Sequence, residues 1–562
     1  MPPQAVHSQS VTERLADWIC SVRAADVPAR VLEKARYQTL NVIASLHAGA
    51  DTEPGKAVRN TVAKWKKTGP CTVIPTGEKM ALHEAVLVNA AYAMALDYDD
   101  YVYMGHTGHS AVLGSWAICE EEKLPTRDLL LAQVIANEIG GRVGASCVLG
   151  PQNGQAWSFI HAIEGAALAS RLYGLNKEQT AHALAIAFYQ PTFTLWPGFM
   201  GPTSKVLTAG GPTVTGIQAA QLAREGLTGA REIFEHPRKG FWASFTYASL
   251  PGMLTGLGKS WITDTIANKK YPGCAYIDTS MDALFMILEE FEKKNRRRMV
   301  AEDVEKIGVR ANLLTVEMDN LSAEHVGEFE KLSPVNINFS IPYNLGIGII
   351  AGKHTAGELS QEFLDKHEPV IRDLAAKTKL THDWEMSFQV AKAFAGVLGR
   401  NSPVAQLSPR QYFKVLRGYQ SQMGGKKKNS INLRGLLFDH GTDLARQAAA
   451  FVRKGRKSAA KAGGGARHEP DLSEVDFSRF KMAFPSEVTI ETARGEKLSA
   501  RQDIPFGAPG QEKYFETVEE KFRTEAGGAL GGGQVDRAIA MMKDLEGSRL
   551  EELTKYVCRP GA

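Results

Sequence analysis

Acidic and imidazole side chains gather in one short stretch of the chain, Leu96 to Ser110, which reads LDYDDYVYMGHTGHS. Its aspartates and histidines could bind a divalent metal, move protons, or form only a polar helix end and loop. The spacing matches neither an HExxH helix nor an EF-hand loop, so we predict no metal site. A carboxylate held near apolar walls would have a raised pKa, and a neighbouring histidine could complement it. We favour an acid/base centre, with a bare polar loop as the alternative.

Three further positions carry side chains that could take part in such chemistry. His161 lies in WSFIHAIEGAALAS, at the start of a helix of small residues. The alternative to a functional role is a histidine that only packs in the core. Lys205 follows GPTS at an expected helix N-terminus, which favours an anion, and a solvent-facing lysine is the alternative. Cys274, in KKYPGCAY, could be a nucleophile, but no nucleophile motif surrounds it and we favour packing.

Helices are expected to position the acidic stretch. From about residue 10 to 265 the apolar spacing is helical almost throughout. The segment 83–100 is apolar nearly all round until its acidic end, which predicts a buried helix that delivers Asp97, Asp99 and Asp100 at its C-terminus. We take Asp97 as the functional carboxylate and give the other two supporting polar roles.

Two more features indicate an all-α bundle in this half of the chain. The segment 124–144 predicts another buried helix, with Thr126 as its N-cap. The segments 161–175 and 211–229 carry small residues on their inner faces, which allows helices to approach closely.

The character of the sequence changes after Lys269. The segments 304–312 and 486–503 are rich in β-branched residues, and the second predicts a hairpin with ARGE at its turn. Helices are predicted between them, at 280–294 and 340–354. This mixture predicts a smaller α+β domain.

Two later stretches have unusual composition. Residues 383–478 are expected to be largely helical and basic. The glycine-rich segment 527–534, GGALGGGQ, lacks the Lys-Ser/Thr pair of a phosphate-binding loop, so we predict a linker there.

Length and composition limit the possible classes of protein. A chain of 562 residues with 44% hydrophobic and 23% charged residues predicts a globular protein of two or more domains. The net charge of +4 gives no reason to expect nucleic acid as a partner. No window approaches the ~18 apolar residues of a membrane span and the N-terminus lacks a signal-peptide core, so a cytoplasmic protein is expected. The six cysteines form no CxxC pair or disulfide framework.

The order of the motifs along the chain is more specific than any one of them. LDYDD is followed by His-Ser-Ala, by Glu138 and Arg142 as ExxxR, by the His161 helix, by SKxL at Lys205, and then by KxYPxC and FSIPY. This order resembles the MmgE/PrpD family, which includes 2-methylcitrate dehydratase, cis-aconitate decarboxylase and iminodisuccinate epimerase. The resemblance covers most of residues 10–380 and returns at FPSEVTIETARGEKLSARQD.

The resemblance implies a mainly α fold and an enzyme that needs no cofactor. An all-helical domain would be built from residues 1–265 and 508–562, and an α+β lid domain from residues 266–507, with a helical insertion near 383–478. Family members are commonly homodimers, with the active site in the cleft between the domains. Carried over by motif, the catalytic candidates are Asp97, His109, His161, Lys205 and Lys269. The substrate-binding candidates are Tyr101, His106, Trp196, Cys274 and, as a looser transfer, Tyr343.

The sequence departs from the family pattern around the expected site. Tyr101 replaces a threonine, the proline of HPS is missing after His109, and the histidines expected near the two lysines are Thr208 and Asp278. These changes remove cationic or hydrogen-bonding groups. Aromatic side chains precede Lys205 instead, at Phe188, Phe193, Trp196 and Phe199. We infer a pocket that is less cationic and more aromatic than one built for citrate-like triacids.

The leading functional prediction is a lyase that acts on a small organic acid by proton transfer α to a carboxylate or carbonyl. A carbon–oxygen hydro-lyase is the simplest form, and decarboxylation is the close variant. An isomerase or epimerase, or a C–C bond hydrolase acting on a cyclic or aromatic-derived keto compound, would use the same residues. A non-catalytic family member is a third possibility. No nucleic acid or membrane is expected as a partner.

Overall fold

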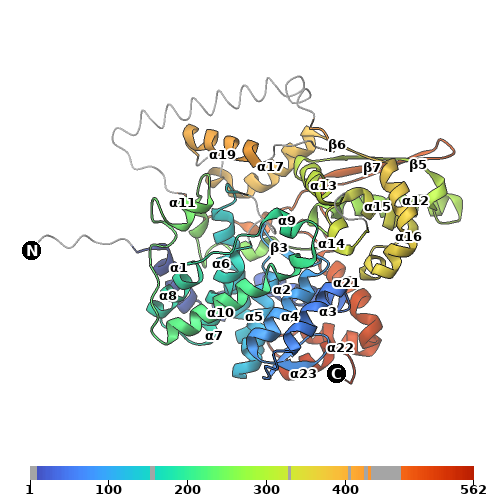
Figure 1. Cartoon of the computed structure of the whole chain (residues 1–562). Helices are drawn as coiled ribbons and strands as arrows, with labels where there is room; N and C mark the ends of the chain where they lie inside the picture. The colour runs from blue at the N-terminus through green and yellow to red at the C-terminus, as the bar shows by residue number, and fades with distance from the viewer. Residues whose placement is uncertain are drawn as a thin grey trace, which may run out of the picture.

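The computed structural model describes residues 9–151, 158–326, 331–402, 407–422, 428–431 and 470–561. Helices dominate, and a small four-stranded sheet lies at one end of the molecule (Figure 1). The predicted mainly α fold with a strand-containing part is therefore confirmed. Among the described residues, no helix is both long and apolar enough to span a bilayer.

The first half of the chain forms a helical bundle around the largest apolar core. Its helices are α1 (Val11–Ser21), α2 (Ala29–Ala50), α3 (Glu53–Ala63), α4 (Leu82–Met94), α5 (Gly108–Glu122), α6 (Thr126–Ser146), α7 (Ile160–Leu172), α8 (Lys177–Ala187), α9 (Trp196–Phe199), α10 (Gly210–Arg224) and α11 (Phe241–Phe245). Short strands accompany them: β1 (Cys71–Val73), β2 (Glu78–Met80), β3 (Asp100–Val102) and β4 (Ile266–Asn268).

The small residues of α7 and α10 let these helices cross in close contact. A Cβ added at Gly216 would lie only 2.1 Å from the carbonyl oxygen of Ala162, and one at Gly165 would lie 2.5 Å from that of Thr213. Neither glycine could therefore be replaced without moving a helix. The expected close approach is confirmed.

The end of the chain returns to its beginning. Helices α21 (Tyr514–Leu530), α22 (Gly532–Lys543) and α23 (Leu550–Val557) follow the sheet, and α21 packs along α2. The hydroxyl of Tyr37 donates to Glu519 at 2.8 Å, and its ring packs on Phe515. Figure 1 shows the blue helix α2 beside the red helices α21 and α22. Through this contact, side chains of α21 lie next to the acidic stretch at residues 96–110.

The sheet has the order β6-β5-β7-β8, formed by β5 (Val304–Ala311), β6 (Thr378–His382), β7 (Ser486–Thr492) and β8 (Lys497–Gln502). β5 runs parallel to β6 and antiparallel to β7, with Ile307 opposite Ile490. The β7–β8 pair is the predicted hairpin, with Ala493–Glu496 at its turn. The short β6, which follows a helix directly, was not anticipated.

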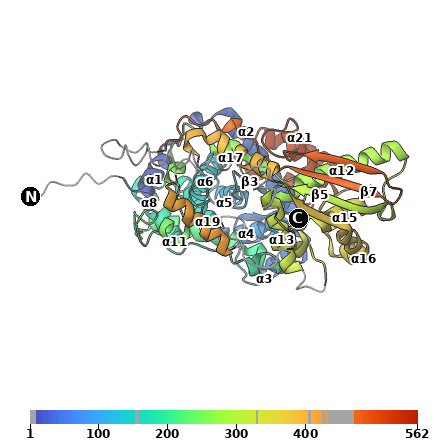
Figure 2. The ribbon, with the colours of Figure 1, turned by 90° about the horizontal axis from the view of Figure 1, so that it is seen from above.

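Helices cover one face of this sheet, as the second view shows (Figure 2). Their apolar side chains and those of the strands form a separate core cluster, whereas Arg310 on β5 and Arg501 on β8 are exposed. The remaining helices of this part are α12 (Asp278–Asn295), α13 (Leu313–Val326), α14 (Pro334–Ile337), α15 (Ile341–Ala351), α16 (Gln361–Lys377), α17 (Trp384–Leu398) and α19 (Pro409–Gln422).

Two local predictions are wrong. Thr126 is the first residue of α6 and not its N-cap, because its hydroxyl donates to the carbonyl of Ser548 at 2.7 Å and Pro125 occupies the cap position. The glycine-rich segment is not a linker, since α21 continues through Gly527 to Leu530 and only Gly531, with φ +76°, separates it from α22. Tertiary packing overrides the low helix propensity of glycine here.

The predicted helical insertion is described only in part. Helices α17 and α19 belong to it, and residues 432–469 lie outside the described residues. The proposed boundaries between the two domains stay a prediction.

Candidate active site

A two-stranded ribbon brings Lys269 to the acidic stretch. Strand β3 pairs antiparallel with β4, with Asp100 opposite Asn268. The backbone N–H of the next residue, Lys269, donates to the carbonyl of Asp99 at 3.2 Å. Lys269, which follows Asp99 by 170 residues in the sequence, is thereby fixed beside the carboxylates that follow α4.

Asp97 is bound by two buried lysines. Its Oδ2 accepts from Lys205 Nζ at 3.0 Å, and its Oδ1 accepts from Lys269 Nζ at 2.6 Å. Burial alone would raise the pKa of Asp97, but the ammonium groups of Lys205 and Lys269 lower it below its usual range. The expectation of a raised pKa is therefore wrong, because the sequence did not reveal two cations at contact distance.

The backbone of Asp97 is left-handed, with φ +50°. It lies three residues beyond the end of α4, so the predicted buried helix delivers the carboxylates, but across a short turn. Aspartate tolerates this conformation better than most residues. The turn directs the carboxylate toward Lys205 and Lys269 together.

Asp99 is the hub of the site, although the sequence suggested only a supporting role. Its Oδ2 lies 2.7 Å from His106 Nδ1 and 2.9 Å from His109 Nε2, and its Oδ1 accepts from Lys269 Nζ at 3.1 Å. Burial opposes ionisation, yet the two imidazoles and the ammonium lower the pKa of Asp99 well below its usual value. One ionised carboxylate thus orients His106 by a hydrogen bond and lies in close charge contact with His109.

Among the described residues, Asp99, His106 and His109 form a group whose ligand atoms could surround a metal ion. The His106 contact, at 2.7 Å, is a charge-assisted hydrogen bond, whereas His109 Nε2 approaches the same oxygen to 2.9 Å without forming a hydrogen bond. The Lys269 ammonium already supplies a cation on the other oxygen of Asp99. The donor set therefore suits proton sharing better than metal ligation.

A cavity of about 110 Å³ lies against this cluster. Asp97, Tyr101, His106 and Cys274 form its polar side. Its remaining walls are mostly apolar and aromatic: Tyr103, Met104, Cys147, Val148, Gly150, Pro151, Trp196, Phe199, Ala275, Tyr276, Leu314, Met318, Phe339 and Phe484. Tyr101, His106, Trp196 and Cys274 thus line the cavity together with Asp97, whereas the predicted Lys205 and Lys269 do not line it and are bound to Asp97.

Two aromatic rings of the cavity also contact a catalytic candidate. Lys205 Nζ lies 4.7 Å from the ring centroid of Phe199 and 4.3 Å from that of Phe339. Of the aromatic residues expected near Lys205, Trp196 and Phe199 line the cavity, whereas Phe188 packs in the core against Phe234. Phe339 was missed, although it opens the FSIPY motif.

His109 and His161 lie behind the cavity wall and are fully buried. The ring of His109 is parallel to that of His106, and its centroid is 5.9 Å from that of His161. His161 Nδ1 is 2.9 Å from Ser110 Oγ, which also donates to Glu164. Burial lowers the pKa of His161 and raises that of Glu164, so both groups are held neutral.

Two candidates have no reactive role in this geometry. Tyr343 does not line the cavity and packs beside the apolar cluster around Leu359. Cys274 lines the cavity, but burial raises the pKa of its thiol to about 12, which keeps it protonated. The preference for packing over a nucleophile at Cys274 agrees with this environment.

Asp100 should make stability depend on pH. Burial and the charge of Asp99 raise the pKa of Asp100 to about 7, so the folded state binds its proton more tightly than the unfolded state does. The stability from this proton is complete below the ordinary pKa of an aspartate and is lost as the pH rises through about 7. Asp100→Asn mimics the protonated form and retains an acceptor for Gln38 Nε2, now 2.7 Å from Oδ2.

We compare the free energies of unfolding of Asp100→Asn and the wild type at pH 5 and at pH 7.5. The difference in favour of Asp100→Asn should be larger at pH 7.5 by roughly 2 kcal/mol, since one pKa unit corresponds to about 1.4 kcal/mol. Urea unfolding at both pH values measures the difference. An advantage of the same size at both pH values would show that Asp100 does not titrate in this range.

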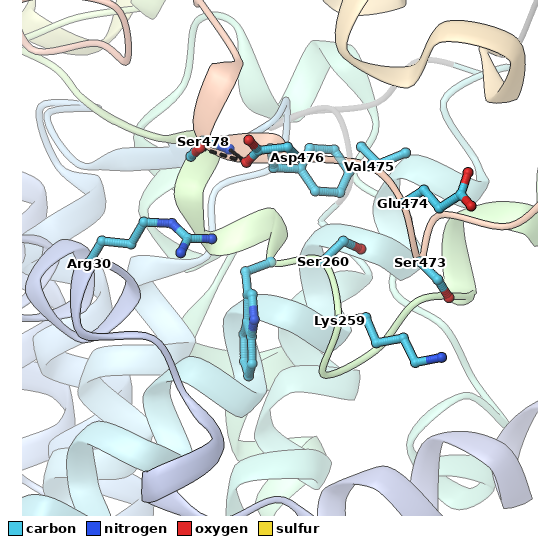
Figure 3. Close-up of a pocket in the computed structure, with 10 residues that line it drawn as sticks. Arg30, Lys259, Ser260, Ser473, Glu474, Val475, Asp476 and Ser478 are labelled. Atoms are coloured by element: carbon cyan, nitrogen blue, oxygen red, sulfur yellow. Dashed lines mark hydrogen bonds between the residues drawn. The ribbon is translucent and has the colours of Figure 1, made fainter.

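A second cavity, of about 400 Å³, opens at the surface between α2 and the segment 473–478. Figure 3 shows Arg30 on one side of it and Asp476, with its hydrogen-bonded Ser478, on another. Arg30 is paired with Asp264 at 3.0 Å. None of the predicted site residues lines this cavity, whereas five of them line the cavity at Asp97, which is therefore the candidate active site.

Known proteins resemble this chain over much of its length. Cis-aconitate decarboxylase from Aspergillus terreus (strain NIH 2624 / FGSC A1156) is 26% identical over 402 residues, which cover 67% of this chain and 79% of that protein. Cis-aconitate decarboxylase from Homo sapiens is 25% identical over 281 residues, or 47% of this chain and 56% of its own length.

Two family models match adjoining parts of the chain. The MmgE/PrpD N-terminal domain matches residues 13–251, which contain Asp97, His106 and Lys205. The MmgE/PrpD C-terminal domain matches residues 271–398, beginning two residues after Lys269. Together the matches cover well over half of the sequence. The chain belongs to the MmgE/PrpD family.

Proposed function

We propose that this chain is a lyase that decarboxylates a small organic acid carrying at least two carboxylates. The observation that carries the proposal is a cavity lined by Asp97, which is paired with two buried lysines, by His106 and by aromatic side chains. The relatives from Aspergillus terreus and Homo sapiens are both named cis-aconitate decarboxylase, which supports the lyase class.

Lys205 and Lys269 would hold the substrate in this proposal. Both ammonium groups are buried, and a substrate carboxylate entering the cavity would be attracted to them in a surrounding of low dielectric. Fixed cations of this kind stabilise negative charge that develops on the substrate during the reaction. Asp97 keeps the two ammonium groups together before the substrate binds.

The aromatic walls favour loss of the second carboxylate. A carboxylate against apolar surface is poorly solvated, whereas the CO₂ that it becomes is neutral. Trp196, Phe199 and Phe339 supply such surface. When the C–C bond breaks, its electron pair stays on the α carbon and spreads toward the carboxyl group bound by the lysines.

His106 would supply the proton that completes the reaction. Its Nδ1 is held by Asp99 at 2.7 Å, and its ring lines the cavity, so Nε2 is the nitrogen available to the substrate. The imidazolium gives its proton to the α carbon, and Asp99 stabilises the charged ring before the transfer. His109, which the family motif had favoured, lies behind it.

Dehydration is the second candidate because Asp97 and His106 both face the cavity. In that reaction Asp97 would take the α proton and His106 would give one to the departing hydroxide. The low pKa of Asp97 in its paired state makes it a weak base, which favours decarboxylation. Epimerisation would use the same two groups.

Incubation with cis-aconitate in D₂O, followed by NMR, tests the proposal. We expect CO₂ release and one deuterium in the product, at either end of the allylic carbanion that loss of CO₂ leaves. Water addition without CO₂ release would replace decarboxylation by a hydro-lyase reaction. Exchange of a carbon-bound proton alone would show proton abstraction without decarboxylation. A homodimer stays a prediction, which light scattering tests.

A further inference from the structure

Helix α21 places a buried ammonium group beneath the acidic stretch. Lys521 is 4% exposed, and its Nζ donates to Asn41 Oδ1 at 2.7 Å, to Ser45 Oγ at 3.3 Å and to the carbonyl of Tyr98. Within the described part of the chain, no carboxylate forms an ion pair with it. Burial lowers the pKa of Lys521 to about 7, opposed by the charge of Asp99.

This arrangement is costly for stability alone. A buried ammonium without a counter-ion carries a desolvation penalty that neutral acceptors offset only in part. Nζ also lies 3.7 Å from the ring centroid of Tyr98, so three dipoles and one aromatic face replace a carboxylate. A methionine of similar length would avoid the penalty. The lysine therefore calls for a role beyond packing.

Tyr98 is the residue through which Lys521 reaches the site. It lies between Asp97 and Asp99, and its carbonyl accepts from Ser45 Oγ at 2.7 Å as well as from Lys521. Its hydroxyl donates to the carbonyl of Lys270 at 2.9 Å, next to Lys269. Both ends of Tyr98 are thus fixed, one to the helices and one to the segment that carries Lys269.

We propose that Lys521 is a positioning residue of the active site, which holds the Tyr98 carbonyl and thereby keeps Asp97 and Asp99 aimed at Lys269 and His106. The left-handed backbone at Asp97 is of higher energy than an ordinary turn and persists only where its neighbours are held. Lys521 and Ser45 supply that hold from two helices. The C-terminal segment of the chain is then part of the site, although none of its residues faces the cavity.

Charge contributes to the same role. Asp99, Asp100 and Glu525 are the acidic groups whose fields reach Lys521, and Lys269 is the opposing cation. An ammonium at this place favours the ionised form of Asp99, which His106 on the cavity side and His109 behind it both contact. Replacing the charge should therefore disturb proton transfer more than substrate binding, because the substrate is held by Lys205 and Lys269.

The test compares Lys521→Met with Lys513→Met, an exposed lysine at the start of the same helix. With cis-aconitate as the substrate, we expect Lys521→Met to lower kcat by about 10- to 100-fold, as for a small misplacement of reacting groups, with KM changed little. Ser45→Ala, which removes the other donor to the Tyr98 carbonyl, should act in the same direction but less strongly. Lys513→Met should match the wild type.

Hydrogen exchange supplies a measurement that needs no substrate. In Lys521→Met the amide of Lys269, bound to the Asp99 carbonyl at 3.2 Å, should exchange faster, and in Lys513→Met it should not. The exchange measurement tests the positioning role even if the protein does not turn over cis-aconitate. In that case the proposed function would be wrong, and the positioning role of Lys521 would still stand or fall on the exchange rates. Unchanged kcat and unchanged exchange in both Lys521→Met and Ser45→Ala would overturn the positioning role, as would a loss confined to KM.

Discussion

Replacing Lys269 with methionine is expected to abolish turnover and to destabilise the fold at the same time. The ammonium of Lys269 binds Asp97 Oδ1 at 2.6 Å and Asp99 Oδ1 at 3.1 Å, and all three side chains are buried. Without it, two carboxylates lose their shared cation, which costs about 3–5 kcal/mol. We expect kcat/KM to fall by at least about 10²-fold, because charge on the substrate is no longer neutralised. Urea unfolding and steady-state kinetics measure the two effects.

The neighbouring lysine is a matched control. Lys270 Nζ contacts the rings of Tyr271 and Phe506 and lies 3.9 Å from Asp282, so Lys270→Met should retain most of the turnover. The double variant Asp97→Asn/Lys269→Met should recover neither stability nor activity, since Asp97 is still paired with Lys205 in Lys269→Met and its removal takes the carboxylate from that buried ammonium. Full activity in Lys269→Met would remove this lysine from the mechanism.

His106→Asn is expected to lower kcat by ~10²–10⁴-fold, the usual contribution of a positioned acid or base. The asparagine amide can still donate to Asp99, which now holds His106 Nδ1 at 2.7 Å, so the cluster should stay in place. Only the titratable nitrogen that faces the cavity is lost. KM should change little, since the lysines remain, and circular dichroism should show the native fold.

His109→Asn is the comparison that gives this result its meaning. His109 contacts the same oxygen of Asp99, at 2.9 Å, but does not line the cavity. Its replacement should therefore cost less in kcat than that of His106. If His109→Asn shows the larger loss, His109 carries the proton and the assignment of His106 is wrong.

The elements that depend on local pattern were predictable from the sequence. The apolar run before Asp97 predicted α4, and β-branched alternation predicted β5 and the β7–β8 hairpin. The β3–β4 ribbon was not predictable, because each strand has three residues and their pairing joins segments more than 160 residues apart. Nothing in a period of two or 3.6 residues encodes such a pairing.

In the site, too, the residue types were predictable from the sequence, whereas the distances between them were not. Residue types and motif order identified Asp97, Lys205 and Lys269, which the fold brings into contact. The direction of the Asp97 pKa depended on how close those lysines come, and periodicity does not report that distance. The choice between His106 and His109 likewise turned on where α5 begins, at Gly108, which leaves His106 outside the helix and beside the cavity.

The left-handed backbone at Asp97 also limits which residues can replace Asp97 during evolution. Asparagine and glycine are the other residues that adopt such a φ readily, and a single base change converts an aspartate codon into either of them. The carboxylate can therefore disappear while the turn around it survives. A lineage of this protein could lose its activity in one nucleotide step, at the cost of the carboxylate that pairs with the buried Lys205 and Lys269.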